Sequence, residues 1–471
     1  MRSNKKTYLL YYFIFGLAIF LRLSLVLFNR EANDAHEAVA NLIIQTGSLP
    51  LKEDCWECFQ PKLYHVVFAF LLKLFNLANN PAYQQNVAGQ AINFFAGFTT
   101  IAIVYLFIKG LTEFDEKLKL FAFALVALNP ALIGINSQAT NDTFVILFST
   151  LAIYFSYNFL KNEKIMDLIL CSLFVILGIS TKTNAWVTFF AILFVLLLKI
   201  YLKEQHKKNI LITVVFLFSV TALSFVNPLN QYLPNIQKYG TPILLNINKD
   251  PLPHFSGDYS ADASGVWYVG DGFFTFKLID LIKHPRLNLG TTIYLPHQTS
   301  FWTVLFGRAH AIHFDNAPPA WSTTGETIFP LLRILYILAI IPTMLLLIGF
   351  GHDFLKFIKG SITKNIAILH TIYFGLFALL FVGYLSFQIL YSLQYRSVTV
   401  IKAIFVFPAL LSFPVFFMQA SKSLYQFLPK RFHWISYIFE STIVALLVCY
   451  VVDVTILIID LAKVYAQKHF L

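Results

Sequence analysis

Apolar runs long enough to cross a bilayer recur along the whole chain of 471 residues, and this feature constrains the fold more than any other. A helix needs roughly 20 mostly apolar residues to span the hydrocarbon core. Hydrophobic residues make up 58% of the chain and charged residues only 13%, about half the share that soluble domains carry. The sequence therefore predicts an all-α, polytopic integral membrane protein.

The positively charged residues set the expected orientation of these spans, because loops rich in Lys and Arg remain in the cytoplasm. Arg2, Lys5 and Lys6 place the N-terminus there. The apolar segment 65–78 is interrupted by Lys73 and, at about 14 residues, is too short for a span. If this segment stays on the far side, every later basic loop is cytoplasmic. These loops then explain the net charge of +11 without a nucleic-acid partner.

About 11 spans follow from this solution, with juxtamembrane helices and a large non-cytoplasmic loop. The expected spans are 8–28, 91–108, 120–136, 143–160, 166–179, 186–202, 210–226, 329–350, 366–389, 400–418 and 434–461. The chain therefore divides into three parts, and its C-terminus is expected on the far side. The parts are a membrane module at 1–226 with a first non-cytoplasmic loop at 29–90, a non-cytoplasmic loop at 227–328, and C-terminal transmembrane helices at 329–471.

Four cysteines are too few for a disulfide scaffold. Cys171 and Cys449 lie within expected spans and are interpreted as buried thiols. Cys55 and Cys58 form a C-x-x-C pattern in the first non-cytoplasmic loop. A local disulfide in an oxidising compartment is favoured there, because a zinc site would need a second pair of ligands.

Four polar stretches are expected to meet at the far face of the membrane. Asp34 and Glu37 begin an amphipathic helix that ends near Gly47 and Pro50. The other stretches are Ser-Gln-Ala-Thr-Asn-Asp at 137–142, Ser-Thr-Lys-Thr-Asn at 180–184, and Tyr-Ser-Leu-Gln-Tyr-Arg at 391–396 with Lys402 slightly deeper. A carboxylate can take a proton from a hydroxyl, and cations stabilise a phosphate leaving group, so the set indicates a transfer reaction.

Each of these residues also has a structural interpretation. Asp34 with Glu37 three positions later is the pattern of a capping box, and the Asn-Asp pair at 141–142 can cap the next span. Lys182 and Arg396 stand where interfacial cations extend toward water.

The order of the N-terminal motifs carries a family resemblance. Asp34 begins a first-loop helix that ends in Gly and Pro, Gln-Pro-Lys-Leu-Tyr follows at 60–64, and a second-loop acid stands at Asp142. A turn ending in Thr-Lys at 178–182 comes next, and Lys402 opens a late element with an aromatic residue and a proline. Together they resemble the GT-C glycosyltransferases, in particular protein O-mannosyltransferases and lipid A aminoarabinose transferases. The likeness is strong up to about residue 220 and weak beyond it.

The sequence also departs from that family's pattern. Gln60 stands where a Lys is common, and Gln84 or Gln85 stands where an Arg is frequent. Ala35 follows Asp34 where a second acid is usual. The substrates of the two named branches therefore do not carry over to this chain.

The resemblance implies a GT-C fold and an inverting sugar transfer from a polyprenyl-phosphate donor to a lipid, glycan or protein acceptor. Asp34 would be the general base, assisted by Glu37, while Asp142 would orient a substrate or hold a divalent metal ion. The expected ligands of the donor phosphate are Lys182, Arg396 and Lys402. The expected substrate-binding residues are Gln60, Lys62, Tyr64, Asn141 and His310. The large loop would cover the site.

Other interpretations stay open. A transporter or flippase for a lipid-linked sugar would show polar mid-span residues and similar halves, and the sequence shows little of either. An acyl- or phosphotransferase would depend on loop histidines, and His310, His313 and Asp315 resemble a loose set of metal ligands. The lean loops favour a bacterial inner membrane over the endoplasmic reticulum. Both place the site away from the cytosol.

Overall fold

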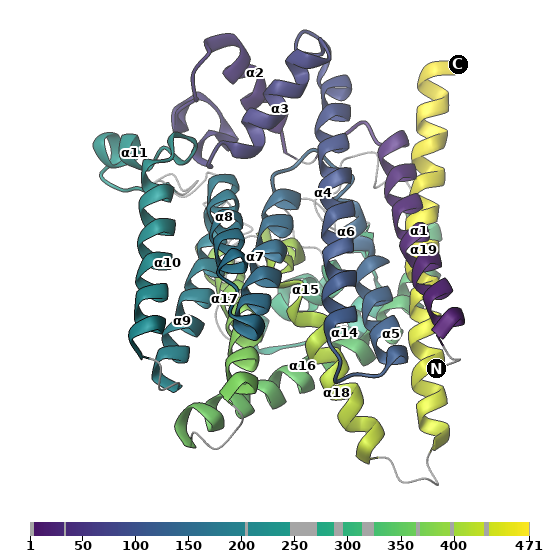
Figure 1. Cartoon of the computed structure of the whole chain (residues 1–471). Helices are drawn as coiled ribbons and strands as arrows, with labels where there is room; N and C mark the ends of the chain where they lie inside the picture. The colour runs from purple at the N-terminus through teal and green to yellow at the C-terminus, as the bar shows by residue number, and fades with distance from the viewer. Residues whose placement is uncertain are drawn as a thin grey trace.

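The computed structural model describes residues 4–32, 34–202, 206–244, 271–286, 295–312, 325–363, 368–395, 400–427 and 433–470. Every regular element within these ranges is an α-helix or a 3-10 helix, and Figure 1 shows the long helices running side by side. The prediction of an all-α polytopic membrane protein is therefore confirmed.

Eight helices in the described ranges are long and apolar enough to cross a membrane. They are α1 (Asn4–Phe28), α4 (Ala82–Gly110), α7 (Asp142–Asn162), α9 (Trp186–Leu202), α10 (His206–Val226), α16 (Phe329–Thr363), α17 (Ile368–Tyr395) and α19 (His433–Phe470). A shorter apolar helix, α8 (Ile165–Thr181), packs along α7 and α10.

Two of the eleven expected spans are not continuous helices. The segment expected at 120–136 divides into α5 (Glu116–Ala127) and α6 (Pro130–Ile135), because the Asn129 side chain accepts a hydrogen bond from the backbone N–H of Leu132 at 2.9 Å and starts a new helix. The segment expected at 400–418 begins as two 3-10 turns, η12 (Ala403–Phe405) and η13 (Phe407–Ala409), before α18 (Ser412–Phe427). Averaged hydrophobicity does not detect such breaks.

The first loop folds over one end of the helices. Helix α2 (His36–Thr46) packs against α3 (Leu63–Leu74), with η1 (Lys52–Asp54) and η2 (Trp56–Phe59) between them. Figure 1 shows α2 and α3 at the end where α1 finishes and α4 starts, and the C-terminus lies at this same end. This arrangement agrees with the charge-based prediction that the segment at 65–78 does not cross.

The described parts of the large loop are short helices. They are η4 (Pro228–Asn230), α11 (Tyr232–Tyr239), α13 (Asp271–Phe274), α14 (Leu278–Lys283), η7 (Pro296–Thr299), α15 (Phe301–His310) and η10 (Gly325–Ile328). The buried side chains of Phe301 and Val304 on α15 share an apolar cluster with Leu332 and Leu335 of α16. This part of the loop is therefore packed against the long helices, and its end reaches the site described below.

A buried arginine fixes the short helix α6 to α1. The Arg22 guanidinium donates from Nε to Asn136 Oδ1 at 3.0 Å and from Nη1 to the backbone oxygen of Ala127 at 2.9 Å. A buried cation needs such partners, and here they include the carbonyl left open by the break between α5 and α6. Arg22 thereby holds in place the turn that follows α6.

Candidate active site

Asp34 lies between the end of α1 and the start of α2, and its carboxylate does not cap that helix. The N-cap position of α2 is Ala35, which makes no side-chain hydrogen bond to the helix. The buried Oε2 of the Glu37 carboxylate has no hydrogen-bond partner among the described residues. The capping-box interpretation is therefore wrong, and both carboxylates need another explanation.

Asp142 and Lys182 form a close ion pair. Asp142 is the first residue of α7, and Lys182 directly follows α8, so the packing of these two helices brings them together. The Lys182 Nζ lies 2.6 Å from Asp142 Oδ1, and both side chains are mostly buried. The Thr140 hydroxyl donates to Asp142 Oδ2 at 3.4 Å. The N-terminus of α7 also favours a negative charge at Asp142.

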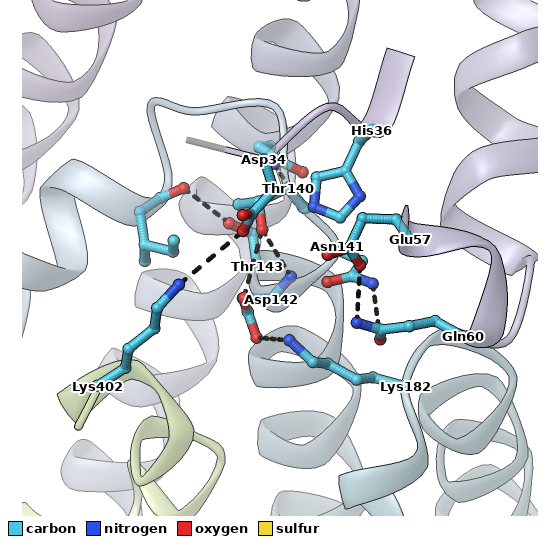
Figure 2. Close-up of polar contacts among 12 residues, drawn as sticks. Asp34, His36, Glu57, Gln60, Thr140, Asn141, Asp142, Thr143, Lys182 and Lys402 are labelled. Atoms are coloured by element: carbon cyan, nitrogen blue, oxygen red, sulfur yellow. Dashed lines mark hydrogen bonds and ion pairs between the residues drawn. The ribbon is translucent and has the colours of Figure 1, made fainter. Parts of the chain in front are cut away.

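Asp34 and Lys402 form a second, looser pair in the same site, as Figure 2 shows. The Lys402 Nζ lies 3.9 Å from Asp34 Oδ2, and the Asp34 side chain is 34% exposed. Lys402 directly precedes η12, and its backbone N–H donates to the side chain of Gln388 on α17 at 3.3 Å. A residue near the N-terminus and one near the C-terminus thus meet at one point.

A small polar cavity of about 20 Å³ joins these residues. Its charged walls are Asp34, Asp142 and Lys402, and the rest comes from the α6 region, the turn before α7, the end of α15 and η12. Two carboxylates and a lysine around one cavity suit a substrate that carries both hydroxyl and phosphate groups.

A second cavity, large and almost wholly apolar, lies beside the first. Its volume is about 460 Å³, and its walls come from α5, α15, α16, α17, η13 and α18. Lys402 and Ile404 line the polar cavity, whereas Ala403 between them lines the apolar one. The two cavities are therefore neighbours, separated by a single turn of chain.

His310 lines the apolar cavity and not the polar one. Its Nε2 lies 2.9 Å from the Thr343 hydroxyl, and its Nδ1 is hydrogen-bonded to Tyr450. The structure therefore does not bring this predicted substrate-binding residue to Asp34. Arg396, His313 and Asp315 lie outside the described residues.

The other predicted substrate-binding residues hold the first loop together. Gln60 Oε1 accepts a hydrogen bond from Asn141 Nδ2 at 3.1 Å. The Lys62 ammonium is fully buried and donates to the backbone oxygens of Cys58 and Gln60. Tyr64 is buried in the apolar cluster of α2 and α3. Lys62 and Tyr64 are thus engaged inside the protein, whereas Asn141 stands directly beside Asp142.

Sequence reasoning missed Glu57, a third carboxyl group at this site. The residue is only 8% exposed, and its Oε2 accepts a hydrogen bond from Gln60 Nε2 at 2.9 Å. Figure 2 shows it beside His36 and Asn141. Its position between Cys55 and Cys58, which form a disulfide, is the one signal that singles it out in the sequence.

The surroundings of Asp34 and Glu57 shift the pKa values of these two carboxyl groups in opposite directions. Burial acts to raise the pKa of Asp34, but the nearby positive charges, Lys402 foremost, outweigh it and hold that pKa below its ordinary value. Burial and then the charge of Asp34 raise the pKa of Glu57 to about 7. At neutral pH the first carboxyl is ionised and the second is partly protonated.

Two histidines beside Asp34 form a neutral pair. His36 Nδ1 lies 3.0 Å from His65 Nε2, so one of these nitrogens donates to the other. Burial lowers the pKa of His36 to about 4 and that of His65 well below its ordinary value. Neither ring therefore adds positive charge to the site at pH 7.

The described residues include no cluster of three or more His, Cys, Asp or Glu side chains suited to a metal ion. Asp34 and Asp142 are the carboxylates on the polar cavity, and each has a lysine partner. The divalent ion considered from the sequence lacks a ligand set in this part of the chain, and no chemical step is routed through it.

Residues 65–227 match the family model described as dolichyl-phosphate-mannose-protein mannosyltransferase. The matched range contains Asp142 and Lys182, so the predicted family resemblance is confirmed for this part of the chain. A search of curated protein sequences gives no significant match.

Two solved structures are distantly similar to this chain. The archaeal oligosaccharyltransferase AglB from Archaeoglobus fulgidus, in complex with an inhibitory peptide and a dolichol-phosphate, has 12% identity and a TM-score of 0.48 over 98% of this chain. This chain spans 56% of the AglB chain. ArnT from Cupriavidus metallidurans, bound to undecaprenyl phosphate, has 12% identity and a TM-score of 0.35 over 88% of this chain and 77% of its own.

Proposed function

We propose that this protein is an inverting membrane glycosyltransferase that moves a sugar from a polyprenyl-phosphate donor to an acceptor. The observation that carries the proposal is the position of the two cavities on either side of one turn of chain, one polar with paired Asp and Lys residues and one large and apolar. A lipid-linked sugar likewise has a polar part, the sugar and its phosphate, joined to a long apolar chain. The match of residues 65–227 to a family of lipid-phosphate-dependent sugar transferases supports this assignment.

The donor would lie across the boundary between the cavities. Its isoprenoid chain would occupy the apolar cavity, where it would exchange contacts with lipid tails for packing contacts with apolar side chains. Its phosphate would lie near Lys402, with Lys182 and Arg396 as further proposed ligands. Charge-assisted hydrogen bonds from these cations would strengthen as negative charge develops on the leaving phosphate.

Asp34 would act on the acceptor. Its carboxylate stays ionised at neutral pH and retains exposure to the polar cavity, so it can accept the proton of an acceptor hydroxyl. The acceptor oxygen then bonds to the anomeric carbon from the face opposite the phosphate. The bond from that carbon to the phosphate oxygen breaks, its electron pair leaves with the polyprenyl phosphate, and the configuration inverts.

Asp142 would have a different task, because Lys182 already holds its carboxylate at 2.6 Å. The pair would orient the sugar and keep Lys182 directed toward the donor phosphate. Glu37 is kept as an assistant to Asp34. The acceptor is proposed to be a lipid, glycan or protein on the non-cytoplasmic side, in a bacterial inner membrane in preference to the endoplasmic reticulum.

The test is transfer by the purified protein in detergent or nanodiscs. A panel of polyprenyl-phosphate sugars would be supplied with membrane-derived acceptors, and released polyprenyl phosphate and the anomeric configuration of the product would be measured. We expect one donor to be consumed, with inversion, and Asp34→Asn to abolish turnover while remaining folded. Retention of configuration, or full turnover by Asp34→Asn, would exclude the mechanism. Donor movement across a vesicle membrane without turnover would favour a flippase.

A further inference from the structure

The Cys55–Cys58 disulfide encloses Glu57 in a short loop directly beside the proposed site, and the mechanism above uses neither the disulfide nor Glu57. The Cα atoms of the two cysteines are 5.0 Å apart. Glu57 is buried, whereas the preceding Trp56 is 58% exposed. The loop therefore directs its carboxyl group inward and its indole outward.

A chain of hydrogen bonds leads from this loop to Asn141, which adjoins the Asp142–Lys182 pair. Gln60 Nε2 donates to Glu57 Oε2 at 2.9 Å, and Asn141 Nδ2 donates to Gln60 Oε1 at 3.1 Å. Asn141 immediately precedes Asp142, whose Oδ1 lies 2.6 Å from Lys182 Nζ. Figure 2 shows these side chains pointing toward one another from η2, α7 and the end of α8.

Lys62 closes the other side of the loop. Its buried ammonium donates to the backbone oxygen of Cys58 and, at 2.6 Å, to that of Gln60. Its backbone N–H donates to the backbone oxygen of Leu229 at 2.8 Å. The segment from 55 to 62 is thus held by a covalent bond, a buried cation and a contact with the start of the large loop.

We infer that Glu57 and Gln60 are positioning residues for the donor-binding pair Asp142–Lys182, and that the Cys55–Cys58 disulfide keeps them in place. The inference rests on the proposed glycosyltransferase function. Glu57 fixes the side-chain amide of Gln60, and that amide fixes Asn141 at the first turn of α7. An unrestrained Asn141 would let the turn before α7 shift, and the Lys182 ammonium would no longer be directed at the donor phosphate.

The disulfide is needed because Glu57 lies in an unfavourable place for a carboxylate. Asp34 faces it with the same charge, and Asp142 adds to the repulsion. Lys182 and Lys402 across the site oppose this repulsion, while His36 is neutral. Lys62 behind the loop adds only a partial positive charge at neutral pH, because burial lowers its pKa to about 7. An ionised Glu57 on an open loop would gain by turning into water. Closure of the four-residue loop removes that alternative.

The experiment compares four variants of the full-length protein for the KM of the donor and for kcat. They are Glu57→Ala, Glu57→Gln, the double variant Cys55→Ser with Cys58→Ser, and that double variant combined with Glu57→Ala. Glu53→Ala is the matched control, because Glu53 lies in the same loop and pairs at the surface with Lys238 at 3.0 Å. The affinity for sugar-free polyprenyl phosphate is measured in parallel, and thermal unfolding establishes that each variant is folded.

We expect Glu57→Ala and the cysteine double variant each to raise the donor KM about tenfold, with a smaller change in kcat. Glu57→Gln should remain close to the parent protein at pH 7, because its amide oxygen still accepts from Gln60. The combined variant should be no worse than either component, because one chain of contacts is broken in both. A dithiol reductant should reproduce the cysteine phenotype in the parent protein and leave the cysteine variant unchanged.

Donor KM values within twofold of the parent in Glu57→Ala and in the cysteine variant would overturn the inference. So would a defect of Glu57→Gln equal to that of Glu57→Ala, or multiplication of the two effects in the combined variant. Absence of transfer by the parent protein would instead refute the proposed function. If one variant does not fold, Glu57→Gln and the reductant on the folded parent protein still decide the question.

Discussion

The site contains two aspartate–lysine pairs that differ in the distance between their charged atoms and in the burial of their carboxylates. Lys182 Nζ lies 2.6 Å from Asp142 Oδ1, whereas Lys402 Nζ lies 3.9 Å from Asp34 Oδ2. The Asp142 side chain is 6% exposed and the Asp34 side chain 34%. The first pair is a short charge-assisted hydrogen bond, and the second is beyond hydrogen-bonding distance.

The difference follows from where the four residues come from. Asp142 and Lys182 are fixed at the ends of two helices, α7 and α8, that pack along each other. Asp34 stands in an irregular linker and Lys402 before a 3-10 turn, so neither is held by a regular helix. A closed pair suits the task of holding geometry. The more open pair lines the polar cavity, so both of its groups can contact a substrate there.

The largest expected effect comes from neutralising the aspartate of the open pair. Asp34→Asn should lower kcat by about 10²–10⁴ with little change in donor KM, because it removes the base and keeps the shape. Asp142→Asn should cost less in kcat, since its amide oxygen still accepts a hydrogen bond from Lys182. Single-turnover transfer measures both, with Asp167→Asn in the first turn of α8 as control. A larger loss for Asp142→Asn would reverse the assignment of the base.

Substitution of the two lysines should affect donor binding and protein stability to different extents. Lys402→Met should raise the donor KM about 10- to 100-fold, because a charged contact to phosphate contributes about 1.5–3 kcal/mol. Its effect on thermal unfolding should be smaller than that of Lys182→Met, because the Asp34 side chain is 34% exposed. Lys182→Met leaves the mostly buried carboxylate of Asp142 without its cation, so it should lower the apparent Tm as well as donor affinity. The comparison fails if Lys402→Met is the destabilising variant.

The sequence predicted the members of the two pairs more readily than their surroundings. Carboxylates and lysines in polar turns between apolar runs are visible without a structure, and charge bias alone indicated that the segment containing α3 does not cross. The burial of Glu57 depends on a disulfide-closed turn, which leaves no periodic pattern. In the sequence, Lys62 cannot be told apart from a lysine that binds phosphate. In the structure, its side-chain nitrogen donates hydrogen bonds to two backbone carbonyls.

The breaks in the expected spans were missed for a related reason. Asn129 lies in an otherwise apolar stretch, and one polar residue barely changes a hydrophobicity average over a window as long as a span. Its effect is local, since its side chain caps the next short helix. His310 was assigned to the substrate site from residue type, whereas packing of α15 against α16 directs it to Thr343 and Tyr450 in the apolar cavity.

The apolar cavity gives a further test, with a smaller effect. Leu347→Trp on α16 should narrow this cavity and raise the donor KM by about tenfold for long isoprenoid chains, because the larger ring takes space that the chain would fill. Donors with short chains should be unaffected. Leu355→Trp, on the same helix and 67% exposed, is the matched control. Equal effects on donors with short and long isoprenoid chains would show that the isoprenoid chain binds outside this cavity.

The smallest expected effect concerns the protonation of Glu57, which lies near the negative charge of Asp34. Glu57 has a pKa of about 7 against an ordinary value of 4.5, so the folded protein retains a proton that the unfolded chain releases. Its contribution to stability is therefore fully present below pH 4.5 and is lost as the pH rises through 7. Glu57→Gln cannot ionise, so its apparent Tm should exceed that of the parent by roughly 1–3 °C at pH 8 and match it below pH 4.5.

Asp34→Asn supplies the control for this last prediction. Removal of the Asp34 charge lowers the pKa of Glu57, so the advantage of Glu57→Gln at pH 8 should shrink in the Asp34→Asn background. A Glu57→Gln variant that melts below the parent at pH 8 would show that the folded site stabilises the ionised form of Glu57, so that its pKa is not raised. The cations Lys182 and Lys402 would then compensate three carboxylates, and the Asp34–Lys402 pair would be less open than its distance indicates.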